Sequence, residues 1–142
     1  MIFIALMFQV QVMTCKVNGV LPDSTCTPGA ILTSDTSVIC HQRTGTIRNV
    51  PNKVKIQVLK NYGFDPRVGK HPPLEIDHLI SLELGGSNDI KNLWPEIADP
   101  SPGYHEKDGV ENSLHRLVCK GITNINWAQT QIAKNWLQFY QK

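Results

Sequence analysis

The fold is decided by a stretch that reads LEIDHLISLELGGSNDIKNLWP at residues 74–95. Its first residues alternate apolar and polar side chains, as a half-buried β-strand does, and Gly85-Gly86 closes the run. A loop at 87–91 leads into a short extended piece at 92–95, where the proline ends any strand ladder. We therefore expect a strand, a loop and a second extended segment.

Two titratable residues stand next to each other in the first of these segments. Asp77 and His78 are neighbours in the predicted strand, so their side chains point to opposite faces. One of them would then be buried, which is an unusual use of two titratable groups. This arrangement indicates a functional site at the end of the strand.

The clearest predicted helix spans 104–120 and ends before Gly121. Its apolar residues form one stripe at helical spacing, made of Val110, Leu114, Leu117 and Val118. Four polar residues at i, i+3, i+4 and i+7 share another face, and these are Asp108, Glu111, Asn112 and His115. A strand-loop-helix unit can therefore bring Asp77 and His78 beside a row of oxygen and nitrogen ligands.

The rest of the chain predicts a single α+β domain over 15–142. The N-terminal segment 15–50 is rich in Thr, Ser, Gly and Pro and contains two short β-branched runs, at 37–40 and 44–48, that we expect to be strands. A helix is expected from Pro51 to Gly63, because proline suits a first helical turn and glycine a helix end. A last amphipathic helix is expected over about 124–140, packing its aromatic residues into the core.

The composition excludes several classes of protein. The 142 residues are 41% hydrophobic and 18% charged, with a formal net charge of +2. An intrinsically disordered chain would combine low hydrophobicity with high net charge. A polybasic nucleic-acid-binding protein would carry more cations, so any contact with nucleic acid must use a local patch. One domain with one modest core fits this length.

The apolar start MIFIALMFQVQVM, residues 1–13, has two interpretations. It has the length of the hydrophobic region of a secretory signal, which we favour for 1–14, although it lacks the basic residues of such a signal. The alternative is a buried N-terminal strand or helix. Lipid attachment at Cys15 is a third, weaker interpretation. No apolar run reaches the ~18 to 20 residues of a membrane-spanning helix.

Four cysteines allow three pairings, and none of them forms the C-x-x-C spacing of a zinc ribbon or thioredoxin-type site. Their even number favours structural disulfides and an extracytoplasmic location. A cytoplasmic or phage-associated protein with four reduced cysteines is the alternative. We favour Cys40 with Cys119, which leaves Cys15 to pair with Cys26. A Cys26–Cys40 bridge is the competing arrangement.

The residue types around Asp77 and His78 suit hydrolysis of phosphodiesters. A neutral histidine, with a pKa of about 6.5, can take a proton from water near neutral pH. Carboxylate and amide oxygens suit one hard divalent cation, Mg²⁺ or Mn²⁺, and a histidine ligand would extend the choice to Zn²⁺ or Ni²⁺.

These residues carry a resemblance. The segments EIDHLISLELGGSNDIKNLWPE (75–96) and EKDGVENSLHRLVC (106–119) resemble HNH endonucleases, and more narrowly a group of small secreted or phage-associated HNH-type proteins. That group shares the CTPGA start at 26–30, an R-x-V-P segment before a helix and an aromatic-rich last helix. The resemblance covers about residue 21 to the C-terminus. It implies a ββα-metal finger over about 73–120, in which two strands and a helix clamp one divalent ion.

Position by position, the resemblance implies roles for three residues. His78 matches the general base, Asp77 the neighbouring ligand, and Asn92 the central asparagine whose side chain ties the loop between the strands. The helical ligand is left open: we favour Glu111, with Asp108 and His115 as alternatives. His115 as an ordinary residue of the helix surface remains an interpretation of equal standing. The zinc-binding cysteine pairs that many HNH proteins carry are absent from this sequence.

The function that we expect is a monomeric, metal-dependent endonuclease of low sequence specificity, acting on DNA rather than RNA. Phosphate contacts are expected mainly from Arg48, Lys107 and Arg116, since cations neutralise phosphates without reading sequence. A plain surface ion pair of Lys107 with Glu111 is the alternative for that lysine. A secreted, disulfide-stapled binding module that keeps the fold but does not cut is the alternative function.

Overall fold

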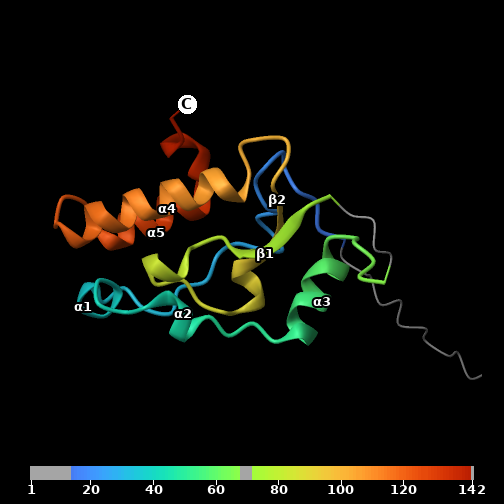
Figure 1. Cartoon of the computed structure of the whole chain (residues 1–142), viewed down its shortest axis with the longest axis horizontal. Coiled ribbons are helices and arrows are strands. Elements are labelled where there is room, and N and C mark those ends of the chain that lie inside the picture. The colour runs from blue at the N-terminus through green and yellow to red at the C-terminus, as the bar shows by residue number, and fades with distance from the viewer. Residues whose placement is uncertain (1–13, 68–71, 142) are drawn as a thin grey trace, which may run out of the picture.

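The computed structural model of the chain describes residues 14–67 and 72–141. Within these residues the chain forms a small α+β domain with five α-helices and one two-stranded sheet (Figure 1). The apolar segment 1–13, with its competing interpretations, lies outside the described residues. Among the helices described, none has the length and apolar character needed to cross a membrane.

The N-terminal part of the domain is helical where we expected strands. It contains α1 (Thr36–Ile39), α2 (Thr44–Ile47) and α3 (Asn52–Asn61). The strands predicted at 37–40 and 44–48 are therefore wrong, because periodicity cannot distinguish a strand from a helical turn in such short runs. The Asp35 carboxylate accepts a hydrogen bond from the Ser37 N–H at 2.8 Å, which caps the first turn of α1. The helix predicted after Pro51 is confirmed as α3.

The sheet consists of β1 (Leu74–His78) and β2 (Leu93–Ile97), which pair antiparallel. Asp77 lies opposite Trp94 and His78 lies opposite Leu93. Directly opposed residues project to the same face, so Asp77 and Trp94 point to one side of the sheet and His78 and Leu93 to the other. The prediction of a strand, a loop and a second extended segment is confirmed.

The C-terminal half is formed by α4 (Tyr104–Cys119) and α5 (Ile125–Asn135). Both predicted helices are confirmed, but the last one ends earlier than expected. The Asn135 side chain accepts a hydrogen bond from the Leu137 N–H at 3.0 Å and caps a 3₁₀ turn over Trp136–Phe139. Trp136 is fully buried by this turn, whereas Trp127 on α5 remains 45% exposed.

Two apolar clusters hold these elements together. The larger one joins Ile39, Ile80 and Leu84 to the buried faces of α4 and α5. The smaller one joins Val58 and Tyr62 of the α3 region to Leu79, Leu93 and Trp94 of the sheet region. The sheet therefore lies between α4 and α5 on one side and α3 on the other, as Figure 1 shows.

The turn after the first strand requires glycine. Gly85 has a φ of 78°, in the left-handed region that residues with a side chain rarely adopt. At Gly86 an added Cβ would lie 1.8 Å from the backbone oxygen of Ile80, so any residue with a side chain would clash there. The Gly85-Gly86 pair therefore lets the loop fold tightly back on the end of β1.

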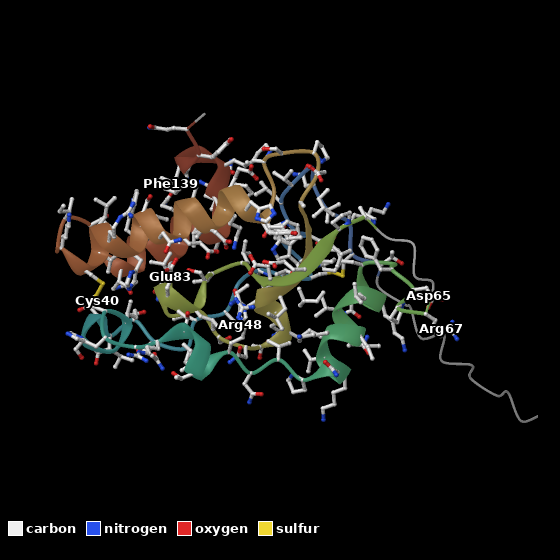
Figure 2. All side chains as sticks on the ribbon, viewed as in Figure 1. Cys40, Arg48, Asp65, Arg67, Glu83 and Phe139 are labelled. Atoms are coloured by element: carbon white, nitrogen blue, oxygen red, sulfur yellow. A yellow bond between two sulfur atoms is a disulfide. The ribbon has the colours of Figure 1, made fainter. Side chains whose placement is uncertain are left out.

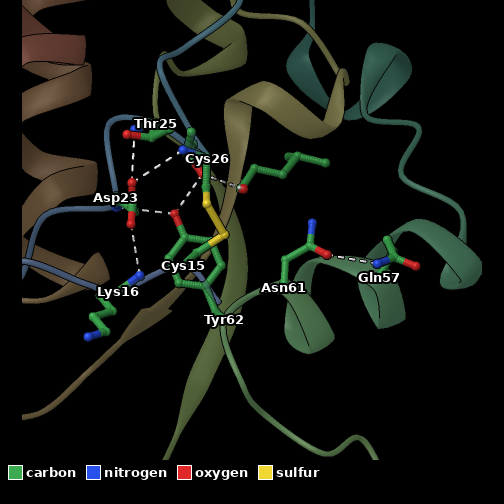
Figure 3. Close-up of a disulfide and its surroundings, with 10 residues drawn as sticks. Cys15, Lys16, Asp23, Thr25, Cys26, Gln57, Asn61 and Tyr62 are labelled. Atoms are coloured by element: carbon green, nitrogen blue, oxygen red, sulfur yellow. Dashed lines mark hydrogen bonds between the residues drawn. A yellow bond between two sulfur atoms is a disulfide. The ribbon is translucent and has the colours of Figure 1, made fainter. Parts of the chain in front are cut away.

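Both disulfides have the favoured pairing, Cys15–Cys26 and Cys40–Cys119, and the competing Cys26–Cys40 bridge is excluded. Cys40–Cys119 joins the end of α1 to the end of α4. Figure 3 shows Cys15–Cys26 beside Tyr62, whose hydroxyl lies 2.7 Å from the Thr27 hydroxyl. Cys40–Cys119 thus ties the N-terminal segment to α4, whereas Cys15–Cys26 closes a loop within that segment, which contacts the end of α3 through the Tyr62 hydroxyl.

We expect the long bridge to stabilise the fold more than the short one. The two bridges span 79 and 11 residues. In the chain-entropy description these loops correspond to about 4.5 and about 3 kcal/mol of unfolding free energy. Cys40→Ala/Cys119→Ala should therefore lower the free energy of urea unfolding by more than Cys15→Ala/Cys26→Ala. The opposite ranking would contradict this account.

Candidate functional site

The site begins with Asn92, which ties the loop to the end of β1. Its Oδ1 accepts from the Ile80 N–H at 2.9 Å, and its Nδ2 donates to the Ile80 and Ser87 carbonyl oxygens, each at 2.9 Å. Asn92 is completely buried, so these bonds form where water does not compete for them. The side chain makes the loop-tying contacts that the resemblance implied, and it fixes the backbone just after His78.

His78 is the last residue of β1 and is 1% exposed. Its Nε2 lies 3.0 Å from Asn88 Oδ1, and the Asn88 amide is oriented by its own Nδ2, which donates to the Ile47 carbonyl at 2.8 Å. A carbonyl oxygen only accepts, so this network assigns the ring proton to Nε2. Nδ1 then carries the free lone pair, and it is buried with no hydrogen-bond partner.

The His78 ring is neutral at pH 7. Burial lowers the pKa of His78, and the positive charge of Arg48 lowers it further, whereas the Asn88 hydrogen bond and Asp77 only partly oppose this. A neutral ring with one proton on Nε2 and an unpartnered Nδ1 is the form that a general base requires.

His78, which carries this Nδ1 atom, lines a cleft of about 210 Å³. The cleft is lined by three parts of the chain: α2 with the residue that follows it, the end of β1 with the following loop, and α4. Its polar lining consists of Thr44, Arg48, Asp77, His78, Ser81, Glu83, Asp108, Glu111 and Asn112. The Ser81 hydroxyl is also buried without a partner. Figure 2 labels Arg48 and Glu83, which come to this cleft from separate segments of the chain. Two unpartnered polar groups around one cleft mark it as a candidate active site.

Lys107 lies behind this cleft as a fully buried ammonium group. Its Nζ donates to Asp77 Oδ2 at 2.7 Å and to the His78 carbonyl oxygen at 2.8 Å, and it pairs with Glu111 Oε1. The expected phosphate contact of Lys107 does not fit this position, because all its donors point into the protein. The alternative ion pair with Glu111 exists, but it is buried rather than on the surface.

The charges around Lys107 respond to burial and to one another. Burial raises the pKa of Glu111 to about 8. Burial acts in the same direction on Asp77 and is the largest effect there, but the positive charge of Lys107 and the hydrogen bonds to the Asp77 carboxylate together outweigh it and hold the pKa of Asp77 below its usual value. The two carboxylates in turn raise the pKa of Lys107, against the effect of burial. Asp77 and Lys107 therefore form a buried pair that stays charged at neutral pH.

Sequence reasoning missed Glu96, a second buried acid on this face. Glu96 is 1% exposed and neither carboxyl oxygen has a donor. Burial raises its pKa to about 10, so Glu96 is protonated at neutral pH, and its neighbour Asp77 can then accept its O–H. Strand alternation could have revealed it, because Glu96 is two residues from Trp94, which lies opposite Asp77.

The expected metal ligands do not gather around one point. Asp77 and Glu111 are held by Lys107, and His115 Nε2 lies 3.5 Å from Cys119 Sγ and 3.3 Å from the Ile39 carbonyl. In the described ranges, Cys40, His115 and Cys119 are the one set of three potential ligands found close together, within 4.8 Å of one another. Both sulfurs of that set form the disulfide, so they are not free thiolates.

The outer edge of the cleft does suit a hard cation. Glu83 and Asp108 line it, and neither forms an ion pair within the part of the chain that the structure describes. Burial raises the pKa of both carboxyls. The negative charge of Asp108 raises the pKa of Glu83 further, and the charge of Asp77 does the same for Asp108. Unneutralised carboxylate oxygens are the donors that Mg²⁺ and Mn²⁺ prefer, so Asp108 fits its expected role better than the other three residues.

Among the cations expected to hold phosphate, Arg48 alone lines the cleft. Arg116 is exposed and donates to the Ser113 hydroxyl at 3.1 Å on the outer side of α4.

Comparison of the chain with protein-family models, with curated proteins and with solved structures finds no match. The function must therefore be argued from the site itself.

Removing the central cation should destabilise the fold. Lys107→Met keeps the length of the side chain but leaves the Asp77 carboxylate buried without a counter-ion, and it removes the donor to Glu111. Breaking a buried pair in this way typically costs about 3 to 5 kcal/mol. Urea unfolding should show this loss for Lys107→Met and almost none for the control Lys120→Met, because Lys120 is exposed. Equal unfolding midpoints for the two variants would contradict the central role of Lys107.

Glu96 should make stability fall as pH rises. Its pKa is about 10 in the folded protein and near 4.5 in the unfolded chain. Between these values the folded state binds the extra proton, so the free energy of unfolding decreases with pH, by at most about 1.4 kcal/mol per pH unit. Glu111, with a pKa of about 8, also makes the free energy of unfolding decrease as the pH rises to about 8.

The measurement is urea unfolding at pH 6 and pH 9 for the wild type and for Glu96→Gln. The amide can still donate to Asp77 but does not titrate, so the variant should lose less stability between the two pH values. If the wild type and Glu96→Gln lose the same free energy of unfolding between pH 6 and pH 9, Glu96 does not hold a proton in the folded protein.

Proposed function

We propose that this protein is a small HNH-type nuclease that hydrolyses phosphodiester bonds of nucleic acid, with His78 as the general base. The observation that carries the proposal is the unpartnered, buried Nδ1 of His78, a residue that lines a cleft also containing Arg48. A non-catalytic binding module would not need to leave an imidazole acceptor buried without a donor, since such a group costs free energy.

The chain's own residues supply most of the reaction. Nδ1 accepts a proton from a water molecule, and the resulting hydroxide attacks the phosphorus while the ester oxygen leaves. Asn88 Oδ1 holds the Nε2 proton throughout, so the ring keeps its orientation. Arg48 contributes the positive charge that draws a phosphate into the cleft.

A divalent ion at the outer edge of the cleft would be held by Asp108 and Glu83. When bound, Mg²⁺ or Mn²⁺ would neutralise charge on the phosphate and polarise it. This role addresses a difficulty of the cleft, in which the two carboxylates would otherwise repel a phosphate. In this proposal Asp77 and Glu111 are not ligands, because the Lys107 ammonium already binds a carboxyl oxygen of each.

The architecture supports the same assignment. The order β1, loop, β2 and α4 is the order of elements in the ββα finger that the resemblance implies. The two disulfides suit a protein of an oxidising compartment, and we therefore propose that it acts as a secreted enzyme. DNA is the proposed substrate.

The base is tested by His78→Ala in a plasmid-nicking assay with Mg²⁺ or Mn²⁺. Loss of a general base typically slows a reaction by about 10² to 10⁴-fold. His105→Ala is the matched control, because His105 is an exposed histidine in the first turn of α4 and does not line the cleft. Cleavage by His78→Ala at the wild-type rate would refute the assignment.

The cation is tested by calorimetric titration with Mn²⁺, which does not depend on catalysis. Asp108→Asn should weaken binding, because it removes a charged ligand while preserving shape. Asp99→Asn should bind as the wild type does, since Asp99 is exposed and outside the cleft. If Asp108→Asn binds Mn²⁺ as tightly as Asp99→Asn, the outer edge of the cleft is not the metal site.

A further inference from the structure

A second hollow lies beside the His78 cleft and shares one residue with it. It has a volume of about 510 Å³ and is lined by Arg48, Val50, Lys55, Glu75 and Ile76. We call it the Arg48 groove. Since Arg48 lines both hollows, a molecule held by Arg48 in the cleft can continue directly into the groove.

We propose that the Arg48 groove binds the nucleotide next to the scissile phosphate, so that the substrate is a polynucleotide strand and Lys55 is a substrate-binding residue. The proposal rests on the proposed nuclease function and adds a binding site for the neighbouring nucleotide and a contact that the motif residues do not reveal.

The sizes of the two hollows support this division. Sites for organic ligands typically measure about 300 to 1,000 Å³. The cleft, at about 210 Å³, is below that range and suits a phosphate group with its attacking water. The groove, at about 510 Å³, is large enough for a sugar and a base. A strand that crosses Arg48 would use both.

The charges of the groove suit a nucleic-acid backbone. Arg48 and Lys55 are exposed, and neither forms an ion pair among residues 14–67 and 72–141. Two free cations on one groove can each neutralise a phosphate of the strand. The charge of Arg48 extends into both hollows, because it acts on Glu75 in the groove and on His78 in the cleft.

The remaining lining suits the nucleoside between two phosphates. Val50 and Ile76 are half-buried and give the groove an apolar surface. Glu75 offers an acceptor that repels phosphate but can accept hydrogen bonds from the amino group of a base. The phosphates are therefore expected at the cations, and the base or sugar against the aliphatic side chains. Few base-edge contacts are available here, which agrees with low sequence specificity.

The test measures binding without cleavage, in the His78→Ala background. The probe is a fluorescently labelled 12-nucleotide single-stranded DNA, followed by anisotropy over a range of NaCl concentrations. Lys55→Ala should bind about fivefold more weakly at 0.1 M salt, and the slope of log K against log salt should shrink by about 0.7, as expected for one lost phosphate contact on a single strand. Lys55→Arg should restore both.

Lys53→Ala is the matched control. Lys53 is an exposed lysine of the same helix, but it lies two residues away, about 200° around the helix axis, and does not line the groove. It should keep the affinity and the salt slope of the background protein. Equal values for Lys55→Ala and Lys53→Ala, or no binding of the oligonucleotide at all, would overturn the groove proposal. Undiminished cleavage by His78→Ala would overturn the nuclease mechanism instead, so the two failures are distinguishable.

Discussion

One buried ammonium group holds together the end of the molecule that carries His78. Lys107 reaches from α4 to the side chain of Asp77 and to the backbone of His78, and it also donates to Glu111 one turn along its own helix. The sheet and the helix would otherwise bring acidic groups together in an apolar setting, where unpaired charges are very costly. The position of His78 relative to α4 therefore depends on this one interaction.

The base of the proposed reaction is held by three side chains, two from the loop between the strands and one from α4. Lys107 holds its carbonyl oxygen, Asn88 holds its ring, and Asn92 holds the backbone of Ile80 two residues later. Each contact is made by a side chain that has further partners of its own. A ring held in this way is already oriented before substrate arrives, which is the supporting arrangement that accurate chemistry requires.

The sequence predicted the helices and strands whose apolar residues recur with a clear period, and it missed those that are too short to show one. Strand alternation and the glycine pair located β1 and its turn, and the apolar stripe located α4. The turns α1 and α2 are too short for a period, so the β-branched residues in them misled the prediction. Lys107 was assigned to the surface because lysine usually lies there, although it is three and seven residues before Val110 and Leu114 and so lies on the buried stripe. The burial of Glu96, and the separation of His115 from the cleft, depend on how strand and helix dock, which spacing along the chain does not specify.

The long disulfide encloses the site in a covalent ring. Every residue that lines the His78 cleft, from Thr44 to Asn112, lies between Cys40 and Cys119. A protease that cuts one peptide bond inside this ring leaves the two pieces linked, and the packed helices can keep them in register. If the protein is the secreted enzyme that we propose, a single cut by an extracellular protease would thus neither release a fragment nor detach His78 from Arg48.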